Sequence, residues 1–115
     1  MAMDWRARCC LKVTEGAFDV CAYEPNPWGV FDTAGNVAEW VVDWYLGDEY
    51  RRRHQVQFPA KDPVVTSGGT ERVVRGGHWW STSEQVMSSA RDKVPPGTAS
   101  PNVGFRTAWR PSSYR

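Results

Sequence analysis

The sequence has 115 residues, of which 41% are hydrophobic, and its formal net charge is +1. This length is typical of one domain, so we expect residues 1–115 to form a single domain. Apolar runs of only a few residues exclude a membrane-spanning helix, and the balanced charge argues against a nucleic-acid-binding protein. We therefore expect neither a membrane nor a nucleic acid as a partner.

Alternation of apolar and polar residues predicts four strands, in chain order at 9–13, 38–44, 72–75 and 103–109. Helix is predicted only at 83–88. Two segments rich in Pro and Gly, 48–70 and 93–102, are predicted to be long loops. The sequence therefore predicts an α+β fold with a small, twisted, mostly antiparallel sheet, long irregular loops and little helix.

The core is expected to be unusual, because the chain has seven Trp, ten Gly, eight Pro and no Ile. Ordinary cores are built from Leu, Ile and Val in regular elements. We therefore expect a core of indole rings and of chain held in turns, in which each buried indole N–H needs a partner. Of the adjacent pair Trp79 and Trp80, we expect the first in the core and the second at the surface.

Cysteine usage indicates a reducing compartment. The three cysteines, Cys9, Cys10 and Cys21, are odd in number, and their spacing matches neither a disulfide framework nor a zinc motif. The N-terminal residues also lack the apolar segment of a signal peptide. We predict a cytoplasmic location.

Three segments carry a resemblance to a known family. They are NPWGVFDTAGNVAEW at 26–40, RVVRGGHW at 72–79, and SAR at 89–91 followed by NVGFR at 102–106. In this order and spacing they resemble the formylglycine-generating enzyme, or sulfatase-modifying factor, family over about residues 24–110. The resemblance implies a C-type-lectin-like fold of the bacterial type. Family domains usually carry a long N-terminal half before the NPWG motif, so we expect a truncated or minimal domain.

The resemblance also implies a calcium site in the first segment. In the family, calcium is bound by side chains at the positions of Asp32 and Glu39 and by main-chain carbonyls at Gly35 and Val37. Calcium prefers six to eight oxygen ligands, and residues 35, 37 and 39 share one side of an extended chain. The alternative is that Asp32 caps the turn through its own backbone while Glu39 pairs with a buried arginine.

The catalytic residues of the family are not matched. Formylglycine-generating enzymes bind copper through two cysteines that follow the RGG motif, but the first position aligns with Ser81 and no cysteine follows Cys21. A serine cannot replace a thiolate for copper(I). We therefore expect no copper and no catalytic residue, and favour a protein that is not an enzyme. The alternative is a fragment or divergent member of an oxidoreductase of the formylglycine-generating or sulfoxide-synthase type.

The segment after the RGG motif has the composition of a binding surface, with aromatic anchors among adaptable polar side chains. Variable proteins diversified by retroelements are similar to this family and vary in this region. We therefore favour a non-catalytic, lectin-like module that binds a protein or peptide, with a sugar as a second possibility and self-association through strand edges as a third. The expected ligand-binding residues are His78, Trp80, Ser81, Ser83, Glu84, Gln85 and Arg91.

Three arginines at motif positions, Arg75, Arg91 and Arg106, have two possible roles. Guanidinium groups recognise anions and carboxylates in bidentate fashion. In a Trp-rich fold with long loops they also bond loop carbonyls, pair with Glu39 or Asp43, and stack on indoles. We favour the structural role.

Overall fold

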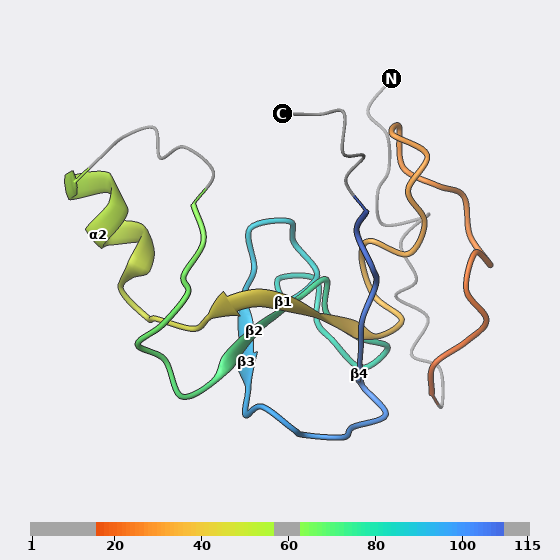
Figure 1. The fold of residues 1–115 in the computed structure, drawn as a ribbon. Helices are drawn as coiled ribbons and strands as arrows, with labels where there is room; N and C mark the ends of the chain where they lie inside the picture. The colour runs from red at the N-terminus through yellow and green to blue at the C-terminus, as the bar shows by residue number, and fades with distance from the viewer. Residues whose placement is uncertain (1–15, 57–62, 110–115) are drawn as a thin grey trace.

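The computed structural model describes residues 16–56 and 63–109. Its elements are β1 (Ala38–Trp44), α2 (Glu49–Val56), β2 (Arg72–Arg75), β3 (Asp92–Val94) and β4 (Val103–Gly104). The strands form one sheet in the order β3-β2-β1-β4 (Figure 1). The strand predicted at 9–13 lies outside the described residues.

The sheet is mixed, with two of its three pairings antiparallel. β2 is antiparallel to both β1 and β3. β1 and β4 are parallel, with Ala38 opposite Val103. Along β1 and β2 the register shifts between Trp40 and Trp44, as at a β-bulge. The predicted α+β class with a small, mostly antiparallel sheet and little helix is confirmed.

Small aliphatic residues, rather than indole rings, fill the innermost positions. The hydrophobic residues that are buried among the described ones are few and small: Ala38, Val65, Val73, Val74 and Val86. Trp28, Trp80 and Trp109 are exposed, and Trp79 is half-buried, with no hydrogen-bond partner for its Nε1. The prediction of an indole core is therefore wrong, although Trp80 is exposed as expected.

Four predicted elements differ from the structure. The helix α2 lies inside the predicted loop 48–70, and β3 opens the predicted loop 93–102. The predicted helix at 83–88 consists of turns, in which the Thr82 N–H donates to Gln85 Oε1 at 2.8 Å and the Gln85 N–H to the Thr82 carbonyl at 3.1 Å. The strand predicted at 103–109 ends at Gly104, beyond which Phe105 is exposed.

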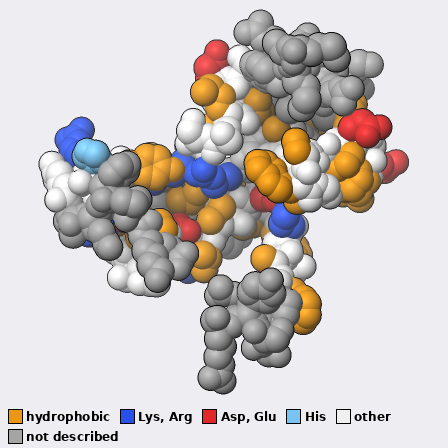
Figure 2. Space-filling view, turned by 90° about the horizontal axis from the view of Figure 1, so that it is seen from above, with side chains coloured by type: hydrophobic (Ala, Val, Ile, Leu, Met, Phe, Trp, Pro, Cys, Tyr) orange, Lys and Arg blue, Asp and Glu red, His pale blue; other side chains and the backbone are white. Residues whose placement is uncertain are grey.

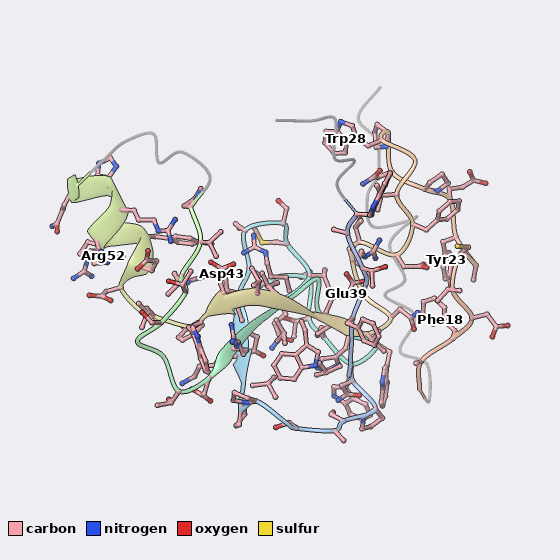
Figure 3. The ribbon with its side chains drawn as sticks, in the orientation of Figure 1. Phe18, Tyr23, Trp28, Glu39, Asp43 and Arg52 are labelled. Carbon is pink, nitrogen blue, oxygen red and sulfur yellow. The ribbon has the colours of Figure 1, made fainter. Side chains whose placement is uncertain are left out.

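The two ends of β1 face different parts of the molecule. Figure 1 shows α2 beyond the Trp44 end of β1, whereas the segment 16–37 lies at the Ala38 end, beside β4. Side chains of β1 follow this division in Figure 3, where Asp43 lies toward α2 and Glu39 toward the segment 16–37. No helix in the described part of the chain has the length and apolar character needed to cross a membrane.

Candidate functional site

A hollow of about 340 Å³ lies beside the RGG motif. It is formed by the ends of β1 and β2, the turns that follow β2, and the start of β3. Five of the seven predicted ligand-binding residues line it: His78, Ser81, Glu84, Gln85 and Arg91. The other two, Trp80 and Ser83, are not among its lining residues.

Short-range hydrogen bonds shape the wall of the hollow. The Ser81 hydroxyl accepts the His78 backbone N–H at 2.9 Å, and the Ser81 N–H donates to the His78 carbonyl at 2.9 Å. The Trp80 N–H donates to His78 Nδ1 at 3.2 Å. These contacts hold His78 and Ser81 together through backbone groups. The Ser81 hydroxyl therefore bonds the His78 backbone and not the imidazole ring.

Gly77 makes this close packing possible. Its φ is +66°, and a Cβ at this position would lie 2.6 Å from Val86 Cγ1 and 3.2 Å from Ser81 Cβ. A side chain is disfavoured both by the left-handed backbone and by this contact. Gly76, the first glycine of the motif, also has a positive φ, of +87°.

A second hollow, of about 950 Å³, lies between the sheet and α2. Its lining includes Val41, Asp43 and Trp44 from β1, and Tyr50 and His54 from α2. The two hollows meet at a pair of cationic side chains, because Arg75 and Arg91 line both. Figure 2 shows Lys and Arg side chains in the depression between the α2 side of the molecule and the rest.

Tyr50 joins the two arginines. The Arg91 guanidinium stacks on the Tyr50 ring at 4.1 Å from its centroid, and Arg75 Nη1 lies 3.4 Å from the Tyr50 hydroxyl. Arg75 Nη2 also donates to the Ser88 carbonyl at 2.7 Å, and both Nη atoms of Arg91 lie 3.4 Å from the Leu46 carbonyl. Both arginines bond loop carbonyls as predicted, but the rings that Arg91 stacks on are tyrosines and not the predicted indoles.

Tyr50 was not predicted as a site residue, because the helix α2 that carries it was not predicted. The helix is anchored by Glu49, whose buried carboxylate pairs with Arg52 at 2.9 Å and with Arg53. Burial raises the pKa of Glu49, but the hydrogen bonds from Arg53 and Arg52 outweigh it and hold the pKa below its usual value. The spacing of Glu49 from these arginines, three and four positions, is a signal of this helix in the sequence, together with the acidic first turn and the basic last turn.

The turn expected to bind calcium is occupied by a guanidinium. Arg106 Nε and Nη2 bond the two Glu39 carboxylate oxygens at 2.6 and 2.5 Å, and the same guanidinium donates to the carbonyls of Phe31 and Asp32 at 3.0 and 3.1 Å. Glu39 is the main reason that the pKa of Arg106 is raised. The Asp32 carboxylate accepts the Cys21 N–H at 2.7 Å. An arginine partner for Glu39 was the alternative that the sequence left open.

The donor set in this turn still has the chemistry that calcium prefers. Asp32 and Glu39 supply carboxylates, and Gly35 and Val37 supply backbone carbonyls, all of them hard oxygen ligands. No group of three or more His, Cys, Asp or Glu side chains close enough to hold a metal is found within 16–56 and 63–109. A calcium ion here would therefore depend on backbone oxygens and would compete with Arg106 for Glu39.

Comparison with known proteins agrees with the motifs. The family described as the sulfatase-modifying factor enzyme 1-like domain, FGE-sulfatase, matches residues 7–111, so the similarity begins earlier than residue 24. The serine/threonine-protein kinase pkn1 of Chlamydia pneumoniae is 39% identical over 92 residues, 77% of this chain and 14% of that protein. The formylglycine-generating enzyme of Streptomyces coelicolor is 37% identical over 92 residues, 77% of this chain and 28% of that protein. The chain thus spans less than a third of the length of these relatives.

A solved structure shares the fold. Treponema denticola variable protein 1 has a TM-score of 0.65 and 29% sequence identity, over 79% of this chain and 31% of that chain. The likeness confirms the C-type-lectin-like fold that the resemblance implied. Since the family match also runs through the NPWG, RGG and GFR motifs, the chain belongs to the sulfatase-modifying factor enzyme 1-like (formylglycine-generating enzyme) family.

Proposed function

We propose that this chain is a non-catalytic, lectin-like binding module of the family, and that the hollow beside the RGG motif receives a protein or peptide ligand. The observation that carries the proposal is the lining of that hollow, which contains five of the residues chosen from the sequence as ligand-binding. Serine, glutamine and histidine side chains supply adaptable hydrogen bonding. The adjacent Trp80, 67% exposed, offers an aromatic anchor next to them.

The chemistry of the side chains supports binding over catalysis. The family's first copper-binding cysteine position is Ser81, and no cysteine follows Cys21 in the whole sequence. Ser81 is held by the backbone of His78 and not by its imidazole, so the pair lacks the contact that would activate a serine nucleophile. The similarity to formylglycine-generating enzymes favours an oxidoreductase role as the second candidate, but these substitutions remove its copper ligands.

The likeness to a variable protein suggests what kind of binding module this is. The turns at 78–90 then present exchangeable side chains on a rigid frame, in which β1, β2 and Gly77 hold the loop. The ligand contacts would then lie on turns and not on strands, as is usual for binding residues on a rigid scaffold. Calcium, if bound at Asp32, Gly35, Val37 and Glu39, would stabilise the turn before β1, which adjoins the hollow because the Gly35 N–H donates to the Gly76 carbonyl at 2.7 Å. None of these four residues lines the hollow, so the ion would not contact this ligand.

The test is a selection followed by site mapping. Peptides selected from a displayed random library, and sugars from a glycan array, are rebound to the chain and to two variants. Glu84→Trp places a large ring in the lining of the hollow, and Met87→Trp places the same ring on the same loop outside the lining. We expect the first variant to weaken binding about tenfold and the second to leave it unchanged. Ligands that bind all three proteins equally would refute the proposal.

A further inference from the structure

We propose that the ligand is an acidic peptide, and that Arg75 and Arg91 together bind one of its carboxylate groups at the junction of the two hollows. This inference rests on the proposed function and names the class of ligand for the same site. It is carried by the position of the two guanidinium groups, which line both hollows and meet at Tyr50.

Arg75 and Arg91 differ from the four cations of the described chain that form ion pairs. Arg52 and Arg53 pair with Glu49, Lys93 pairs with Glu71, and Arg106 pairs with Glu39. Neither Arg75 nor Arg91 has a carboxylate within ion-pair distance among the described residues. Their partners are carbonyls, a hydroxyl and tyrosine rings, all neutral.

Each guanidinium also retains donors. A guanidinium group has five N–H bonds in a planar fork. Arg91 directs both Nη atoms at a single oxygen, the Leu46 carbonyl, at the long distance of 3.4 Å. Among residues 16–56 and 63–109, the only short bond of Arg75 is the one from Nη2 to the Ser88 carbonyl at 2.7 Å. Two like charges held at one tyrosine repel one another, and a bound anion would relieve that repulsion.

The acidic residues around the hollows do not neutralise this pair. Asp43 accepts the Val65 N–H at 2.8 Å, and Glu49 is taken by Arg52 and Arg53. Asp92, which lines the smaller hollow, accepts the N–H of its neighbour Lys93 at 2.8 Å. Glu84 and Asp92 in that hollow disfavour a second negative group there, so the carboxylate of the ligand is directed to the arginines.

The same arrangement favours a carboxylate over a phosphate. A carboxylate is planar and carries one charge, and its two oxygens match the fork of a guanidinium. A phosphate carries about two charges and would face Glu84 and Asp92 at close range. Hollows on both sides of the arginines leave room for residues that flank the acidic one, which suits an extended peptide more than a small acid.

The experiment measures binding of two fluorescein-labelled peptides to the full chain by anisotropy, one of four Gly-Glu repeats and one of four Gly-Gln repeats. We expect the Gly-Glu peptide to bind at least about tenfold more tightly, and to weaken as salt is raised. Arg75→Gln and Arg91→Gln should each weaken it about tenfold, whereas Lys93→Gln, which removes the same charge at the Glu71 pair, should not.

Controls separate folding from binding. Arg75→Lys and Arg91→Lys keep the charge, and should lose part of the affinity because they lose the planar fork. If a Gln variant fails to melt cooperatively, the inference is judged by whether the unaltered chain binds the Gly-Glu peptide more tightly than the Gly-Gln peptide. Equal binding of the two peptides, no binding of Gly-Glu, or tighter binding of a matched phosphoserine peptide would overturn the inference. If neutral ligands selected from the library bind the unaltered chain and bind Glu84→Trp more weakly, the proposed function stands and only the inference of an acidic peptide fails.

Discussion

The Arg106 guanidinium donates hydrogen bonds to both carboxylate oxygens of Glu39, a residue 67 positions earlier in the chain. Through the same group it holds the carbonyls of Phe31 and Asp32. One side chain thereby ties together the turn before β1, the strand β1 itself, and the segment after β4. In a fold with two-residue and three-residue strands, such a contact replaces part of the missing ladder of hydrogen bonds.

The first prediction concerns this ion pair. Arg106→Gln and Glu39→Gln should each lower the free energy of unfolding by about 1 kcal/mol, the upper end for exposed pairs, since both side chains are partly exposed. The double variant should cost less than the sum of the two single changes, because the contact can be lost only once. Urea unfolding of the four proteins measures this coupling, and strict additivity would contradict it.

Calcium provides the second prediction. A calcium ion that binds Asp32 and Glu39 in the folded state must raise the melting temperature relative to excess chelator. Because Arg106 competes for Glu39, we expect a larger calcium-dependent rise in Arg106→Gln than in the unaltered chain, and none in Glu39→Gln. Thermal melts with calcium and with chelator test this. A melt that is indifferent to calcium in all three proteins would refute the cation site.

The third prediction concerns Gly77. Gly77→Ala should lower the free energy of unfolding by about 2–4 kcal/mol, since it adds both a left-handed alanine and a contact with Val86. Gly97→Ala is the matched control. Its φ is +82°, but nothing lies within 4 Å of the added Cβ, so it should cost only about 1 kcal/mol. Urea unfolding measures both losses. Equal losses of unfolding free energy in the two variants would show that the close packing over Gly77 does not contribute.

The fourth prediction is a pH dependence at Glu49. Since its pKa is lowered in the folded state, its stabilisation is present above the unfolded pKa of about 4.3 and is lost as the pH falls through the folded value. Glu49→Gln should therefore cost about 1–2 kcal/mol at pH 7. The difference between the two proteins should shrink below about pH 4.

The control for that experiment is Glu24→Gln, at an exposed position. It should leave the free energy of unfolding nearly unchanged at pH 7. Urea unfolding at pH 7 and pH 3 is the measurement. A cost of Glu49→Gln that stays constant with pH would show that the charge of Glu49 contributes nothing to the folded state.

The sequence predicted the parts of the fold that depend on local pattern. β1 and β2 have the bounds that alternation indicated, although the adjacent Val73 and Val74 are both buried, so β2 is covered on both faces. α2 was missed because its residues, EYRRRHQV, have no apolar stripe and its helix depends on the ion pairs of Glu49. β4 was overestimated, since the chain after Gly104 turns Arg106 toward Glu39 instead of continuing along β1.

The candidate site was predicted to the extent that its residues lie in one segment. His78, Ser81, Glu84 and Gln85 follow the RGG motif directly, and the structure places them in one hollow with Arg91. Tyr50 could not be predicted, because its contacts with Arg75 and Arg91 join α2 to residues 25 and 41 positions away. Trp80 and Ser83 lie outside the lining, since a turn points neighbouring side chains in different directions.

The most direct test of the account is chemical-shift mapping of the ¹⁵N-labelled chain with a library-selected peptide. We expect the shifted amides to cluster at 77–92 and around Tyr50, where the two hollows meet at Arg75 and Arg91. Amides of 16–31 and 105–109, beyond the Ala38 end of β1, line neither hollow and should stay in place. Shifts confined to that end, or spread evenly over the chain, would contradict the assignment of the ligand to this hollow.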